Sequence, residues 1–201
     1  TSHSSSCQLL INHGLTPQEI FFYRFLIAYL GIWVISPKRL FTNNWQDELW
    51  LVAGGIFGGS LYFFTENTAL GITQASNVSF IICTAPLLTT ILSLLFYKSE
   101  KASKGLIYGS LLALMGVGLI VFNGSFVLKI SPIGDLLTLL AALSWAFYSL
   151  IIKKMAGRYP TIFITRKIFF YGVLTILPAF LLHPLHPDTV VLLQPAVLFN
   201  L

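Results

Sequence analysis

Charged residues are scarce in this chain: Asp, Glu, Lys and Arg make up 9% of its 201 residues, against 56% hydrophobic residues. A soluble globular protein carries about 25% charged residues. The composition therefore excludes a water-soluble monomer, and it excludes a disordered chain, which would be poor in apolar residues. Cysteine is equally rare, since Cys7 and Cys83 are the two present, and these cannot form a disulfide scaffold.

Motifs for enzyme chemistry are missing as well. The sequence has no HExxH, no GxSxG and no GxxxxGK[ST] motif, and its seven acidic residues form no paired carboxylates within an apolar run. We therefore expect no enzyme, no metal site and no cofactor. The net charge of +5 comes from twelve basic residues spread between apolar runs, not gathered on one face, so we expect no nucleic-acid partner either.

Long apolar runs make up most of the sequence. A membrane-spanning helix needs about 20 apolar residues, whereas barrel strands need about ten with strict alternation. Six runs fit helices: Ile20–Ser36, Leu49–Leu70, Val78–Phe96, Gly105–Phe122, Ile133–Ile152 and Thr161–Leu182. A further run, Val190–Leu201, begins near the end of the chain. The predicted fold class is all-α, a polytopic helical membrane protein.

The loops between these runs predict the orientation. Basic residues gather in alternate loops, a pattern that marks the cytoplasmic side. One set of loops holds Lys38, Arg39, Lys98, Lys101, Lys104, Lys153, Lys154 and Arg158, whereas the other holds Lys129. The run Ile20–Ser36 must then cross from outside to inside, although no export signal precedes it. We therefore expect a missing helix before residue 9 and a chain truncated at both ends.

Two segments of the chain resemble each other. LLINHGLTPQEIFFYRF and LIIKKMAGRYPTIFITRK share an apolar helix end, a Gly, a Pro and an aromatic-rich run, and each has a basic residue seven positions after the Pro. One copy leaves the membrane outside and the other inside, which indicates an inverted repeat. We predict a first repeat over residues 1–125, lacking its first helix, and an incomplete second repeat over residues 132–201.

The chain resembles EamA-type members of the drug/metabolite transporter superfamily in three segments: GLTPQEIFFYRFLIAYL, ENTALGITQASNVSFIICTAPLLTTILSLLFYKSEKASKGLIYGSLLALMGVGLIV and GDLLTLLAALSWAFYSLIIKKM. The resemblance implies two inverted five-helix repeats in a ten-helix bundle, embedded in the bacterial inner membrane. It also implies export or exchange of a small metabolite or drug, with a small-molecule substrate and the lipid bilayer as partners. Proton coupling is open, and so is a homodimer, because a truncated chain would need dimerisation or a complementing fragment to transport.

Ionisable groups within apolar runs are costly and commonly functional, so they are the first site candidates. Arg24 and Glu66 lie at matching depths, and small residues on their helix faces (Ala28 and Gly31 for Arg24, Gly55 and Gly59 for Glu66) suggest that both point into the bundle. Arg24 could attract an anionic group and Glu66 could bind a proton or a substrate amine. The alternatives are a structural Arg24–Glu66 pair, or Arg24 reaching to the membrane interface.

Further candidates lie in the other runs. Lys167 is the repeat partner of Arg24, with an interfacial anchor as the alternative. Asp135, Thr138, Ala142, Trp145 and Ser149 form one stripe, which lines a cavity or packs on a neighbour, with Trp145 and Tyr148 as aromatic walls.

Asn77 and Thr84 share a face just before Pro86, which should kink the helix near a substrate site or for packing. Glycines at 54, 55, 58 and 59, and at 105, 109 and 116, predict helix contacts.

Two functions remain open. The first is a secondary transporter working by alternating access, driven by a proton or substrate gradient. The second is a non-transporting or inactive truncated membrane subunit.

Overall fold

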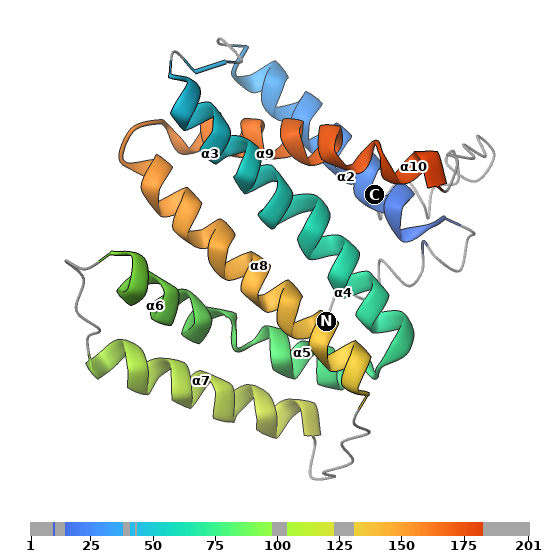
Figure 1. Ribbon diagram of the computed structural model, residues 1–201, viewed down its shortest axis with the longest axis vertical. Helices are drawn as coiled ribbons and strands as arrows, with labels where there is room; N and C mark the ends of the chain where they lie inside the picture. Colours follow the sequence, from blue (N-terminus) through green and yellow to red (C-terminus); the bar gives the residue numbers. More distant parts are fainter. Residues whose placement is uncertain are drawn as a thin grey trace.

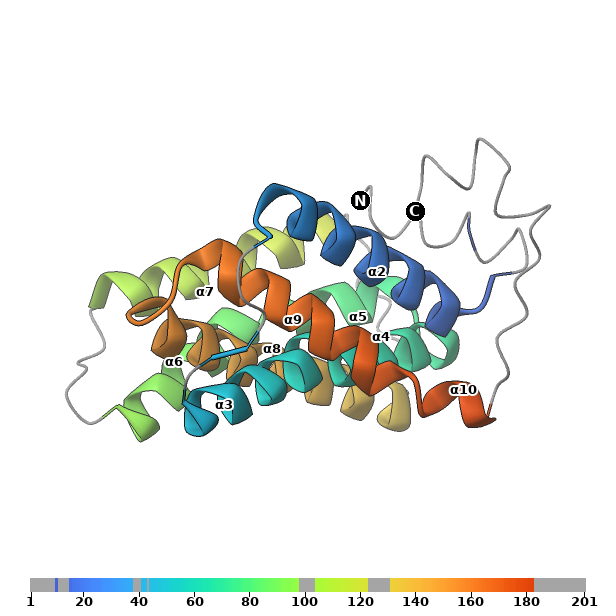
Figure 2. The same ribbon diagram turned by 90° about the horizontal axis from the view of Figure 1, so that it is seen from above.

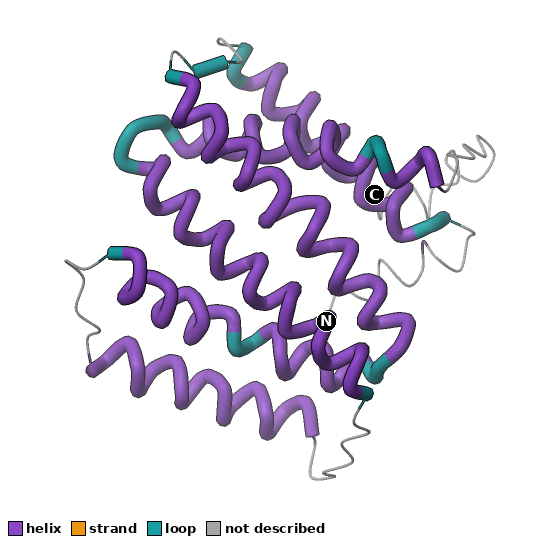
Figure 3. The backbone as a smooth tube through the Cα atoms, in the orientation of Figure 1, coloured by secondary structure: helices purple, strands orange, loops and turns teal. Residues whose placement is uncertain are grey.

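The computed structural model describes residue 10 and residues 15–37, 41–42, 44–97, 104–122 and 131–182. Within these residues the chain is a set of helices joined by short turns, with no strand (Figure 3). Four helical stretches are long and apolar enough to cross a membrane by length and composition: Gln18–Ile35, Ala75–Phe96, Pro132–Ala156 and Thr161–Leu181. The predicted polytopic helical membrane fold is confirmed.

Local sequence signals explain where the first helices begin. Helix α2 (Pro17–Ile35) starts with a capping box, in which the Thr16 side chain accepts from the Glu19 amide and Glu19 accepts from the Thr16 amide. Proline at the first helical position is favourable because its missing N–H would have no partner there. Helix α3 (Trp45–Gly55) begins at an Asn44 cap, whose side chain accepts from the Gln46 amide at 3.0 Å.

Helix α3 runs on through a π-helical turn, η1 (Ile56–Ser60), into α4 (Leu61–Ile72). The remaining helices are α5 (Ala75–Ile82), α6 (Ala85–Phe96), α7 (Lys104–Phe122), α8 (Pro132–Ala156), α9 (Thr161–Ile176) and α10 (Ala179–Leu182). A turn at residues 177–178 separates α9 from α10, because Pro178 cannot donate the backbone bond that a continuous helix needs.

Helix α8 is the centre of the bundle. It lies between α3–α4 on one side and α5–α6 on the other, and α7 packs outside α5 and α6 (Figure 1). Helix α9 packs against α2, α3 and η1, and Figure 2 shows it lying between α2 and the layer that contains α3, α4 and α8. Helices from both ends of the described chain therefore meet around η1.

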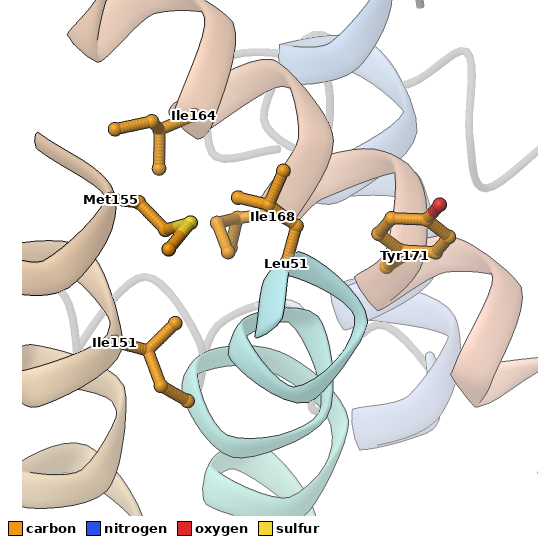
Figure 4. Close-up of a cluster of buried hydrophobic side chains, with 6 residues drawn as sticks. All are labelled: Leu51, Ile151, Met155, Ile164, Ile168 and Tyr171. Atoms are coloured by element: carbon orange, nitrogen blue, oxygen red, sulfur yellow. The ribbon is translucent and has the colours of Figure 1, made fainter. Parts of the chain in front are cut away.

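A buried apolar cluster joins α3, α8 and α9. Its members are Leu51, Ile151, Met155, Ile164, Ile168 and Tyr171 (Figure 4). Glycines bring these helices close together: a Cβ on Gly54 would lie 2.5 Å from the Ile168 side chain, and one on Gly55 would lie 2.5 Å from the Tyr171 Cβ. Small residues allow this approach, which is how helices associate in a bilayer.

The glycines of α7 do not have this role in the described part of the chain. A Cβ added at Gly109 or Gly116 would meet no described atom within 4 Å, so the helix contact predicted at these two positions is not found among the described residues. Helix α7 lies at the margin of the bundle, and it approaches α5 and α6 without using these two positions. The predicted run Val190–Leu201 and the helix expected before residue 9 lie outside the described residues.

Candidate functional site

A cavity of about 580 Å³ lies where α2, η1, α4, α8 and α9 meet. Six of its ten lining residues are aromatic, and one carries an ionisable carboxyl group. The lining residues are Phe25, Gly58, Tyr62, Phe63, Glu66, Trp145, Tyr148, Thr165, Ile168 and Phe169. The structure thus places three of the candidates predicted from sequence, Glu66, Trp145 and Tyr148, around one space.

Glu66 is the charged side chain of this lining, and among the described residues that line the cavity no Lys, Arg or His accompanies it. Tyr62, one turn earlier on the same helix, is placed to donate a hydrogen bond to the Glu66 carboxylate. The wall also contains the Thr165 hydroxyl of α9 and, on α8, the Tyr148 hydroxyl and the Trp145 indole N–H. The described lining of this cavity therefore combines one carboxyl group with several aromatic side chains.

Three of the six aromatic rings, from α4 and α8, lie next to one another. Trp145 of α8 lies with its ring centroid 5.1 Å from that of Tyr62 and 5.2 Å from that of Tyr148. Trp145 is 40% exposed, so its ring is not fully enclosed by its neighbours. Three adjoining rings with tilted planes offer both faces and edges to a bound molecule.

The π-helical turn η1 sets which residues join Glu66 on the cavity side. Gly55 and Gly59, which were expected on the Glu66 face, lie close to the α9 backbone, and the adjoining residue, Gly58, lines the cavity. A π-turn contains one residue more than an α-turn, so every later side chain is displaced around the helix axis. Ser144 stabilises this turn by donating to the Phe57 carbonyl at 2.8 Å.

The residues of the polar stripe predicted on α8 have different neighbours. Among them, Trp145 lines the cavity. Asp135 accepts from the Ser131 amide at the start of the helix, whereas Thr138 is fully buried and donates to the Gly134 carbonyl. Ala142 is also fully buried, and Ser149 donates to the Trp145 carbonyl. Most of the stripe therefore packs rather than faces the cavity.

Arg24 lies on α2 and is half-buried beside Phe25, but it is not among the residues that line the cavity. Among the described residues no ion pair joins Arg24 to Glu66. The small-residue face proposed for Arg24 makes no contact at Gly31 within the described residues, because a Cβ added there would meet none of their atoms within 4 Å. Helix α2 packs instead through Phe21 and Phe25.

The helix break expected near Pro86 lies between α5 and α6. Helix α5 ends at Ile82, Thr84 donates to the Ile81 carbonyl at 2.6 Å, and Pro86 is the second residue of α6. Asn77 is buried in α5 at 3% exposure. Asn77, Thr84 and Pro86 are absent from the lining of the Glu66 cavity, so the structure does not bring them to that site.

A buried cluster of charges joins α3 to α9 at the end of the bundle predicted to face the cytoplasm. Lys167 is fully buried and forms an ion pair with Glu48, which also accepts from the Tyr171 hydroxyl and from the Thr42 amide. The neighbouring Arg166 donates to the carbonyl of Ser36 at the end of α2. Lys167 is therefore not an interfacial anchor.

A second ion pair lies beside this cluster. Asp47 accepts from Arg158 at 2.6 Å and from the Tyr159 hydroxyl at 2.9 Å, which ties α3 to the turn between α8 and α9. Burial and the Asp47 carboxylate raise the pKa of the Tyr159 phenol above its ordinary value of 10.0, so the hydroxyl remains a donor at neutral pH. Sequence reasoning missed Asp47 and Glu48, although two adjacent acids at the start of an apolar run were visible.

A second cavity, of about 500 Å³, is almost wholly apolar and lies between α3, α6 and α8. The one charged residue in its described lining, Lys154, sits over the Trp50 ring at 3.7 Å. Within the described residues no group of three or more His, Cys, Asp or Glu side chains could hold a metal ion. The Glu66 cavity is thus the described space in which a carboxylate meets several aromatic rings.

Comparison with known proteins decides the family. The model of the EamA-like transporter family matches residues 6–122. The chain belongs to the EamA-like transporter family. This EamA-like chain is therefore an integral, multi-pass membrane protein of a transporter family.

Its relatives carry the same general description. An uncharacterized transporter of Archaeoglobus fulgidus is 30% identical over 168 residues, covering 82% of this chain and 57% of that protein. The uncharacterized transporter YdfC of Bacillus subtilis is 31% identical over 151 residues, covering 73% of this chain and 47% of YdfC. The EamA-like chain thus spans about half the length of the curated relatives it matches. No solved structure matches it.

Proposed function

We propose that this EamA-like chain forms part of a secondary carrier that exports or exchanges a small metabolite or drug by alternating access. The proposal places the chain in a ten-helix bundle of two inverted repeats, with residues 1–125 in the first repeat and residues 132–201 in the second. In such carriers the substrate lies between the repeats, and one repeat rocks against the other.

One observation carries this proposal: the cavity around Glu66 has walls from both predicted repeats. Phe25, Tyr62 and Glu66 come from the first, and Trp145, Tyr148 and Thr165 come from the second. A molecule bound there would contact both moving parts, so its binding could be coupled to their relative motion.

The carboxylate suggests the energy source. A carboxyl group with mainly aromatic neighbours can exchange a proton as the substrate enters or leaves, because the surroundings disfavour its unpaired charged form. We propose proton coupling through Glu66 on this basis. A homodimer is proposed as the alternative assembly of the carrier.

The test is substrate-driven proton flux in liposomes. The purified chain is reconstituted with a pH-sensitive dye inside, and small amines, amino acids, nucleobases and sugars are added outside. We expect one class to move protons with the unmodified chain and not with Glu66→Gln, whereas Asp135→Asn, which removes an acid outside the cavity, should behave like the unmodified chain.

An equal flux in Glu66→Gln would exclude the proton role of Glu66. Absence of flux with every class, in a chain that is folded and inserted, would favour the second function, a non-transporting membrane subunit.

A further inference from the structure

We propose that the Glu66 cavity selects a monovalent organic cation, such as a quaternary ammonium or phosphonium compound or a protonated amine that carries a bulky apolar group. This inference rests on the proposed transport function and adds the chemical class of the substrate. It follows from charge, from ring geometry and from size, and each of the three is visible in the described residues.

The charge of the cavity favours a cation. Glu66 contributes a negative charge, and no described lining residue contributes a positive one. The basic side chains of α9 are held elsewhere: Lys167 pairs with Glu48, and Arg166 donates to the Ser36 carbonyl. On α2, Arg24 lies outside the lining. A carboxylate in apolar surroundings is stabilised by an opposite charge, so a bound cation would satisfy it, whereas an anion would be repelled.

The ring geometry favours the same class. Trp145, Tyr62 and Tyr148 form a row with centroid separations of 5.1 and 5.2 Å, close to the Glu66 carboxylate at the Tyr62 end. Aromatic faces carry partial negative charge and attract cations within about 6 Å, with indole the strongest of the three ring types. Clusters of rings of this kind recognise quaternary ammonium groups, which cannot donate hydrogen bonds and therefore depend on such faces.

The size of the space fits a bulky ligand. A volume of about 580 Å³ falls within the range of roughly 300–1,000 Å³ typical of sites for drug-sized molecules. Phe25, Phe63 and Phe169 add apolar walls that suit the substituents of a cation rather than the hydroxyl groups of a sugar. A small, strongly hydrated inorganic cation would find one carboxylate and few other oxygen ligands, so the cavity favours organic cations.

The experiment is equilibrium binding of radiolabelled tetraphenylphosphonium to the chain in lipid nanodiscs. Benzyltrimethylammonium and its uncharged isostere neopentylbenzene serve as competitors of nearly equal shape. We expect the cation to displace the label and the isostere not to. Glu66→Gln should weaken tetraphenylphosphonium binding by about tenfold or more, and Trp145→Leu by several-fold, since each removes one of the attractions that define the site.

Two variants provide matched controls. Trp33→Leu removes a 50% exposed tryptophan of α2 outside the cavity, and Asp135→Asn removes an acid outside it, so both should bind tetraphenylphosphonium like the unmodified chain. Equal displacement by neopentylbenzene, or unchanged binding in Glu66→Gln, would overturn the inference.

Failure of this inference and failure of the proposed function give different results. A proton flux driven by a neutral or anionic compound, without tetraphenylphosphonium binding, would support the carrier function and would contradict selection of a cation by the cavity. Charge-selective binding that depends on Glu66, without any proton flux, would support the cation-binding site and would contradict transport by this chain.

Discussion

Lys167 has no surface open to solvent, and an ammonium group in that position needs a counter-charge and further hydrogen-bond partners. Glu48 supplies the charge, Tyr171 lies 3.2 Å away as an additional partner, and the Phe41 ring lies 4.6 Å from the ammonium. The lysine was recognisable in the sequence as an ionisable residue in an apolar run. Its partner was not, because Glu48 lies 119 positions earlier and only the tertiary fold brings the two together.

Breaking this pair from one side should destabilise the protein strongly. Lys167→Met leaves the Glu48 carboxylate buried without its cation, and such changes cost about 3–5 kcal/mol. The double variant Glu48→Gln, Lys167→Met removes both charges, so it should recover part of the loss. Thermal unfolding of the detergent-solubilised protein measures both.

Arg158→Gln is the control, because this arginine side chain is 53% exposed and Tyr159 still donates to Asp47. It should cost less than about 1 kcal/mol. A Lys167→Met variant as stable as Arg158→Gln would show that the buried pair does not stabilise the fold.

At the scale of helices, much of the architecture follows from the sequence and one feature does not. Apolar run length, the Pro17 and Pro86 positions and the Thr16 cap account for where helices begin and break. The π-turn at Ile56–Ser60 could not be predicted from the sequence, because IFGGS is an ordinary Gly-rich segment with no signal for a π-turn. Its cause is tertiary: Ser144 bonds the Phe57 carbonyl and Tyr148 lies against Gly58. The sequence therefore singled out Glu66, Trp145 and Tyr148 as site candidates, whereas Gly58, which lines the same cavity, was predicted as a helix contact.

Alanine substitutions distinguish packed glycines from unpacked ones. At Gly55 an added methyl would lie 2.5 Å from the Tyr171 Cβ and 3.0 Å from the Tyr171 carbonyl carbon, and backbone cannot rotate away. Overpacking of this kind costs about 1–3 kcal/mol, so Gly55→Ala should lower the unfolding temperature.

Gly109→Ala is the matched variant in α7, where the methyl meets no described atom within 4 Å. Alanine in an unstrained helix position is more favourable than glycine, so this change should be neutral or should stabilise by up to about 1 kcal/mol. Destabilisation of similar size in both variants would contradict the packing described for α3 and α9.

At the scale of the whole molecule, the Glu66 cavity and the two ion pairs involve different sets of helices. The Glu66 cavity has walls from α2, α4, α8 and α9, whereas the Asp47–Arg158 and Glu48–Lys167 pairs join α3 to the α8–α9 segment at the predicted cytoplasmic end. If the two predicted repeats rock against each other, these pairs must separate once in each transport cycle.

Cross-linking tests this requirement. With Cys7 and Cys83 replaced by serine, Asp47→Cys and Arg158→Cys place two thiols where the structure has a 2.6 Å ion pair. A short thiol cross-linker should stop substrate-driven proton flux and leave tetraphenylphosphonium binding unchanged, because the cavity itself is untouched. The two single-cysteine variants, treated identically, should retain flux; flux that persists in the fully linked protein would show that this end does not open.

The buried Glu48–Lys167 pair also has a consequence for biogenesis. Helix α9 carries Arg166 and Lys167 side by side, and translocon measurements assign each such charge about 2.5–3.5 kcal/mol against entry into lipid at a helix centre. Helix α3, with its acids at the predicted cytoplasmic surface, is synthesised long before α9 emerges from the ribosome. Glu48 would then already be in place to pair with Lys167. Helix α9 would enter the bilayer by packing against helices already inserted, not as an independent segment.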